Sequence, residues 1–182
     1  PAPIPGDMRL MPHLHLSLQS GDDLVLKRMK RRHARKDAIA FCEQVRRLRP
    51  GIVLGADFIA GFPTETDEMF AHTLDLVDEC GLTFLHVFPF SARPGTPAAR
   101  MPQVASSTIR ERARRLREMG EAVLRKRLAA DVGSLRDVLI ESDTQGRTEH
   151  FLPVSISSQG AGSVQRLQIV GSDERRLIAA GL

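Results

Sequence analysis

The chain contains no tryptophan and no tyrosine, so phenylalanine supplies all of its 4% aromatic content. Contacts with a nucleic acid would therefore depend more on Arg and Lys than on a platform of stacked aromatic rings. No apolar run among the 182 residues is long enough to span a bilayer, and we expect no association with a membrane. The first eight residues also lack the basic and apolar segments of a signal peptide. Because the chain opens with Pro1 instead of Met, we expect a piece of a longer polypeptide.

Cysteine is also scarce, since Cys42 and Cys80 are the two in the chain. Both lie in amphipathic stretches that are far apart in the sequence, so we expect them to be buried free thiols. Free thiols favour a cytoplasmic location. His13, His15 and His86 lie on expected strands, and we interpret them as histidines packed in the core or at its rim. The sequence therefore predicts no metal site.

Strands and helices are expected to alternate over the first 130 residues. Apolar residues at strand or helix spacing predict three strands and four helices. The expected strands are 13–18, 52–60 and 84–90, and the expected helices are 22–32, 36–49, 64–81 and 108–131. Thr64 with Asp67 and Thr108 with Glu111 are expected to cap the last two helices. This order implies an α/β fold with a parallel arrangement.

The pattern changes after Gly133. Short alternating segments at 135–141, 151–157, 164–170 and 176–180 are separated by turns that contain Gly, Ser or Asp. They predict a small antiparallel β-barrel. We therefore divide the chain into a domain of residues 1–130 and a β-domain of residues 131–182.

Three loops follow the three expected parallel strands at their carboxyl ends, which is the edge where α/β proteins bind ligands. They are LQSG at 18–21, DFIAGFPTET at 57–66 and FPFSARPGTPAA at 88–99. Each loop alone would be read as an ordinary turn. In the order PHLHLSLQSG, KRMKRR, IAGFPTET and HVFPFSARPGTPAA, they resemble the radical S-adenosylmethionine (SAM) methylthiotransferases. In the β-domain, GRTEHFLPVSI carries the resemblance.

The resemblance implies the C-terminal part of a partial (β/α)6 radical SAM barrel, followed by a TRAM-like, RNA-binding β-domain. It implies SAM as a cofactor and [4Fe–4S] clusters in the full-length protein. The family binds one cluster through a CxxxCxxC motif, which is absent here, and two isolated cysteines cannot hold a cluster. The missing N-terminal part of the same polypeptide is therefore an expected partner, and we expect the chain to be inactive alone.

The resemblance also implies a set of SAM-binding residues. Gln19 and Arg31 match positions at the methionyl end of SAM, Asp57 a position at the ribose or the methionyl amine, and Ser91 a position at the adenine edge. Ile59 and Gly61 lie in the segment that flanks adenine. The full cofactor-binding set is Gln19, Ser20, Arg31, Asp57, Ile59, Gly61 and Ser91. Simpler readings remain open, namely a strand-end cap for Gln19, a solvated helix face for Arg31, a backbone acceptor for Asp57 and a core residue for Ile59.

HLHLSLQSG and LHVFPFS resemble the subgroup that adds a methylthio group to C2 of N6-threonylcarbamoyladenosine, beside the tRNA anticodon. Two alternatives stay open: the subgroup that acts on isopentenyladenosine, and a non-catalytic tRNA-binding module. The net charge of +4 fits an anionic partner. Basic residues exceed acidic ones by seven to none in 27–36 and by eight to three in 106–130, whereas 133–182 holds five Arg and six acidic residues. These runs are read either as solvated helix faces or as contacts with tRNA phosphates.

Overall fold

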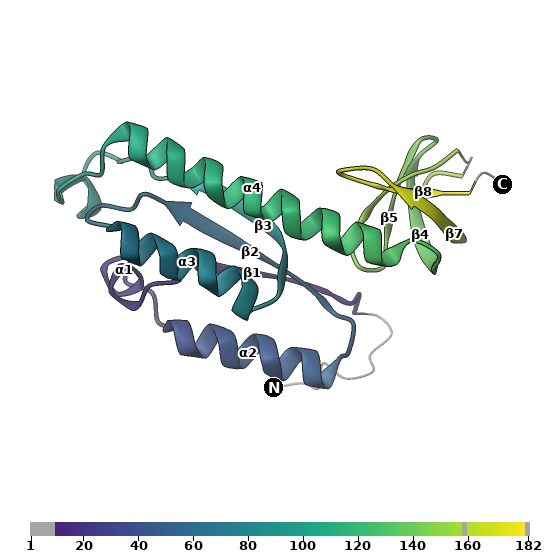
Figure 1. Ribbon diagram of the computed structural model, residues 1–182, viewed down its shortest axis with the longest axis horizontal. Helices are drawn as coiled ribbons and strands as arrows, with labels where there is room; N and C mark the ends of the chain where they lie inside the picture. Colours follow the sequence, from purple (N-terminus) through teal and green to yellow (C-terminus); the bar gives the residue numbers. More distant parts are fainter. Residues whose placement is uncertain (1–9, 158–159, 181–182) are drawn as a thin grey trace.

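The structure is a computed structural model that describes residues 10–157 and 160–180. A parallel sheet with helices is joined by one long helix, α4, to a small β-barrel (Figure 1). The sheet has the order β1-β2-β3, and both of its strand pairs are parallel. The strands are β1 (His13–Gln19), β2 (Val53–Ala60) and β3 (Leu82–Pro89). The helices are α1 (Asp23–Arg28), α2 (Arg35–Leu48), α3 (Asp67–Glu79) and α4 (Ser106–Asp131), and a short 3-10 helix spans Ala98–Arg100. The predicted α/β arrangement is confirmed.

One face of the sheet packs against helices α2, α3 and α4. Alternate residues of the strands point to this face, among them Leu54 and Phe58 of β2, and both are buried. They meet apolar side chains of the helices, such as Phe70 of α3 and Leu116 of α4. Cys42 and Cys80 belong to the same core and are free thiols, as the sequence predicts.

The intervening residues of each strand point to the other face, which we call the open face. His15, Asp57 and His86 lie on it, one from each strand. This alternation follows from strand geometry, because successive side chains point to opposite sides of a sheet. Phe88 of β3 lies on the same face and is 52% exposed.

The C-terminal residues form a closed barrel with the strand order β4-β5-β6-β8-β7. Its strands are β4 (Leu135–Ser142), β5 (Gln145–Thr148), β6 (Pro153–Ser155), β7 (Val164–Ser172) and β8 (Leu177–Ala179). The barrel is as predicted, with two corrections. Strand β5, with the sequence QGRT, was missed because it has no apolar alternation, and β6 pairs with β8 in parallel. Leu128 of α4 packs into the core of this barrel.

The predicted helix caps are wrong. Thr66, and not Thr64, caps α3, because its hydroxyl accepts a hydrogen bond from the Met69 amide. Helix α4 begins at Ser106 after Ala105, whose side chain cannot cap it, so Thr108 lies within the first turn. Among the described residues, no helix is both long and apolar enough to cross a bilayer.

Candidate functional site

The carboxyl end of the sheet brings three of the predicted residues near one another. Gln19 ends β1 with a left-handed φ of 71° and pairs with Phe58 of β2. Arg31 donates a hydrogen bond from Nη2 to the carbonyl oxygen of Ser17 over 2.7 Å. The Ser17 hydroxyl lies 3.4 Å from Oδ2 of Asp57. A guanidinium and a carboxylate thus flank Ser17, and they suit the carboxylate and the ammonium of an amino acid.

A cavity of about 490 Å³ lies beside the carboxyl ends of β2 and β3. Ile59 lies two residues beyond Asp57 on β2 and lines the cavity together with Ser91. Phe88, Pro89 and Phe90 supply much of the remaining wall. The volume lies within the range of roughly 300–1,000 Å³ that is typical of small-molecule sites. The cavity offers apolar walls for a flat ring and a polar edge at Ser91.

Ser20 and Gly61 take other places. The Ser20 side chain is buried, contacts the Thr73 hydroxyl and accepts a hydrogen bond from the Asp22 amide. Gly61 has a φ of 77°, and a Cβ there would lie 2.6 Å from Cγ1 of Ile109 on α4. Both residues therefore have structural reasons for their identity, and the structure does not place the Ser20 hydroxyl in the cavity.

A buried ion pair holds the loop after β2. Glu65 accepts a hydrogen bond from the Gly61 amide at 2.9 Å and pairs with Arg112 of α4 at 2.9 Å. Burial raises the pKa of Glu65, and the charge of Arg112 opposes this shift. Glu65 therefore fixes this loop through its contacts with the Gly61 amide and Arg112. The reading of Arg112 as a solvated or phosphate-binding residue is wrong, because its side chain is only 5% exposed.

The open face also carries a cluster that the sequence did not reveal. His15 Nε2 lies 2.9 Å from Asp57 Oδ1, and His86 Nδ1 lies 3.4 Å from the same oxygen. The two imidazole rings are 4.4 Å apart. The residues lie 42 and 29 positions apart in the chain, so only the strand register brings them together.

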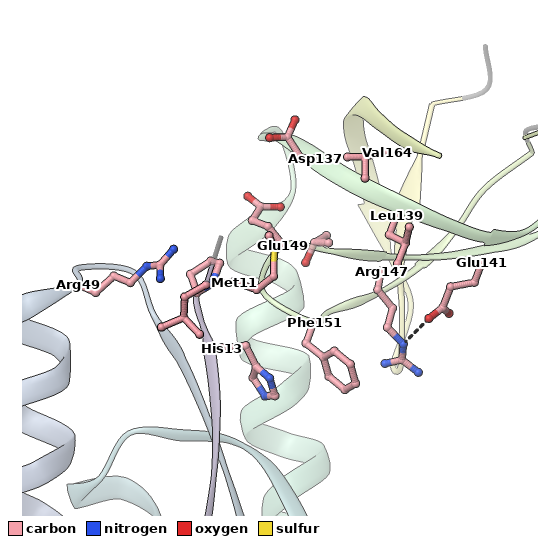
Figure 2. Close-up of a pocket in the computed structure, with 13 residues that line it drawn as sticks. Met11, His13, Arg49, Asp137, Leu139, Glu141, Arg147, Glu149, Phe151 and Val164 are labelled. Carbon is pink, nitrogen blue, oxygen red and sulfur yellow. Dashed lines mark hydrogen bonds and ion pairs between the residues drawn. The ribbon is translucent and has the colours of Figure 1, made fainter. Parts of the chain in front are cut away.

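A second cavity, of about 510 Å³, lies where the amino end of the sheet meets the β-barrel (Figure 2). Phe151 is central to this junction: it stacks on His13 at 4.8 Å, and Arg147 lies over its ring at 4.3 Å. Arg147 also pairs with Glu141. Burial lowers the pKa of His13, and the neighbouring histidines lower it further, which favours the neutral ring. This stack ties the barrel to the sheet.

The two cofactors implied by the resemblance differ in how they fit these residues. The guanidinium of Arg31, the carboxylate of Asp57 and the cavity lined by Ile59 and Ser91 are chemically compatible with SAM. A [4Fe–4S] cluster does not fit, because both cysteines of the chain are buried in the helix-covered core and cluster binding takes several thiolates.

Comparison with known proteins identifies relatives of the chain. The sequence model of the radical SAM superfamily matches residues 7–77. A threonylcarbamoyladenosine tRNA methylthiotransferase of Rickettsia prowazekii is 49% identical over 91% of this chain and 40% of its own length. A tRNA-2-methylthio-N(6)-dimethylallyladenosine synthase of Ruegeria pomeroyi is 37% identical over 93% of the chain and 40% of its own length. Among solved structures, coproporphyrinogen III oxidase from Escherichia coli has a TM-score of 0.49 and 21% identity, covering 69% of this chain and 33% of that one. The chain spans about 40% of the length of the curated relatives.

Proposed function

We propose that this chain belongs to the radical SAM superfamily and is part of a tRNA methylthiotransferase that acts on C2 of N6-threonylcarbamoyladenosine beside the anticodon. The observation that carries the choice of nucleoside is the difference in identity. The chain is 49% identical to a threonylcarbamoyladenosine enzyme and 37% identical to a dimethylallyladenosine enzyme, over similar shares of its length. The substrate and the activity are those of the whole protein, to which this chain would contribute one part.

In this proposal the open face holds SAM. When bound there, SAM would supply the radical chemistry of the family, and the residues of this chain would hold and orient it. The guanidinium of Arg31 would bind the methionyl carboxylate through two hydrogen bonds. Oδ2 of Asp57 faces Ser17 and can accept from the ammonium or a ribose hydroxyl. Ile59 and the wall of the cavity exclude water from the adenine, and Gln19 closes the end of β1.

The remaining assignments are part of the same proposal. Residues 1–130 would form a portion of the SAM-binding barrel, and residues 131–182 a TRAM-like domain that binds RNA. The sheet with its helices and the β-barrel have separate apolar cores, which supports this division. Leu128, near the end of α4, packs in the core of the barrel. The rest of the polypeptide would supply the cluster ligands, so the isolated chain would be inactive. The two free thiols favour a cytoplasmic location.

The SAM site can be tested on the chain itself by titration calorimetry. We expect weak binding, because no cluster is present to chelate the methionyl group, and a further loss in Arg31→Ala. Arg32→Ala is the matched control, since it removes an exposed charge from the neighbouring position. Equal affinities of the wild type and Arg31→Ala would exclude the carboxylate contact.

The reaction can be tested by deleting the gene and measuring modified nucleosides in total tRNA by mass spectrometry. We expect the 2-methylthio form of threonylcarbamoyladenosine to disappear and its unmethylthiolated precursor to accumulate. Loss of the 2-methylthio form of isopentenyladenosine instead would favour the other subgroup. If both forms persist while the purified chain still binds tRNA, the chain belongs to a non-catalytic binding module.

A further inference from the structure

We propose that His15, Asp57 and His86 form a binding site for one divalent transition-metal ion on the open face of the sheet. Each residue offers one ligand atom, and the three atoms lie within 4.8 Å of one another. Two imidazoles and one carboxylate form a ligand set that is typical of divalent transition metals such as zinc or iron, with further positions open to water. The inference departs from the sequence-based expectation of no metal site, and it does not rest on the proposed function.

The spacing of the ligand atoms suits such an ion. With metal–ligand bonds of about 2.1 Å, neighbouring ligand atoms are separated by about 3.0 Å in an octahedral site and about 3.4 Å in a tetrahedral one. The distances from Asp57 Oδ1 are 2.9 Å to His15 Nε2 and 3.4 Å to His86 Nδ1. An ion can therefore displace the proton between His15 and Asp57 without moving either side chain far. The two imidazole ligand atoms lie within 4.8 Å of each other, and they can move to the required separation by side-chain rotation.

The backbone holds two of the three ligands in place. Asp57 and His86 are register partners on β2 and β3, and His15 is the register partner of Gly55, two residues before Asp57. A Cβ at Gly55 would lie 2.6 Å from His15 Nδ1. The absence of a side chain there lets the imidazole lie against β2 and direct Nε2 toward Asp57. Mutual orientation of this kind is what a metal site requires of its scaffold.

The cluster is accessible from solvent and leaves one carboxylate oxygen for other uses. The side chains of His15, Asp57 and His86 are 28%, 25% and 61% exposed. Both imidazoles face Oδ1 of Asp57, whereas Oδ2 faces the Ser17 hydroxyl. The metal site and the predicted contact with SAM would thus use different oxygens of the same side chain. Imidazole nitrogens favour Zn²⁺ or Co²⁺ over Mg²⁺ and Ca²⁺, which prefer oxygen ligands.

The test is a titration of the full 182-residue chain with Co²⁺, followed by calorimetry and visible absorption, and then displacement by Zn²⁺. We expect one ion per chain and a more than tenfold loss of affinity in His15→Ala and in His86→Ala, since even outer-sphere changes cost on the order of tenfold. His72→Ala is the matched control. His72 Nδ1 lies 2.9 Å from Asp22 Oδ2, but among the described residues no third ligand joins that pair. Its removal should leave the affinity unchanged.

Three results would overturn the proposal. One is the absence of stoichiometric Co²⁺ binding by the wild-type chain. Another is an unchanged affinity in His86→Ala, which is the decisive variant if His15→Ala fails to fold, because the His86 side chain is the more exposed of the two. The third is a thiolate-to-cobalt charge-transfer band, which would place the ion at Cys42 and Cys80.

Discussion

Replacing Arg112 with Met tests the buried ion pair that joins α4 to the loop after β2. The Arg112 and Glu65 side chains are 5% and 1% exposed, and their charged atoms lie 2.9 Å apart. Arg112 also donates to the Glu65 carbonyl oxygen at 3.0 Å and pairs with Asp67 at 2.7 Å. Methionine fills much of the same volume but leaves the Glu65 carboxylate buried without a counter-charge.

The expected loss is large. Breaking a buried pair by removing one partner destabilises a protein by about 3–5 kcal/mol. For a chain of this size each kcal/mol lowers the melting temperature by about 2–4 °C, so the midpoint should fall by about 6–20 °C. Thermal and urea unfolding, followed by circular dichroism, measure the change.

The loss should also depend on pH. Without Arg112, nothing offsets the burial that raises the pKa of Glu65, so its folded-state pKa lies further above the unfolded value. The folded state then binds the proton more tightly than the unfolded state. The destabilisation is therefore fully present above the raised folded-state pKa, and it shrinks as the pH falls through that pKa toward the ordinary range of a glutamate.

Two further variants decide whether the reasoning holds. Arg114→Met removes an exposed arginine that pairs with Glu111 and Glu118 on the same helix, and it should barely change the midpoint. Adding Glu65→Gln to the Arg112→Met variant removes the buried charge while keeping an acceptor for the loop amide, and it should recover at least half of the loss. The ion-pair account is refuted if Arg112→Met is no worse than Arg114→Met, or if the double variant is no better than the single one.

Three other predictions concern the cofactor, the loop and RNA. Anaerobic reconstitution of the isolated chain should yield no cluster-type absorption spectrum and no more than one iron per chain, because the thiolates of a cluster are absent. Gly61→Ala should lower the melting temperature, because its Cβ would collide with α4 and its φ is 77°; an unchanged melting curve would contradict the model of the loop. The affinity for tRNA can be measured across a series of salt concentrations. The variant Arg110→Glu/Arg125→Glu on α4 should reduce the affinity and its salt dependence more than Arg166→Glu/Arg175→Glu in the barrel does. All four positions are exposed, and the reverse order would make the barrel the main electrostatic surface.

Much of the fold could be predicted because hydrophobic periodicity reflects burial directly. Residues 52–60 form a nearly continuous apolar run, and β2 is indeed the central strand of its sheet. Strand β5 escaped prediction because Gln145–Thr148 carries no apolar alternation, and its place in the barrel comes from pairing with β4 and β6. The helix caps were misplaced because Thr64 and Thr66 are both suitable by type, and only the backbone conformation distinguishes them.

The candidate site could be predicted in part. The carboxyl ends of parallel strands meet at one edge of a sheet, so Gln19 and Asp57 were expected to lie close together, and Ile59 and Ser91 indeed line one cavity. The sequence could not show that Ser20 is buried, because a serine at a strand end fits both a ligand contact and a packed turn. Nor could it distinguish Arg112 from the exposed arginines around it. That distinction depends on which side of α4 faces the loop after β2.

The core and the open face depend on the same strand register. Along β2, Ala56 and Phe58 point into the helix-covered core, whereas Asp57 and Ile59 point to the open face. A slip of one residue would bury Asp57 among apolar side chains and expose Phe58 to water. Burying a carboxylate without a partner costs several kcal/mol, and exposing a phenylalanine loses about 1.5–3 kcal/mol of burial. The apolar packing on the helix side therefore keeps His15, Asp57 and His86 aligned on the opposite side, and mutations in that core would be expected to displace the cluster without touching it.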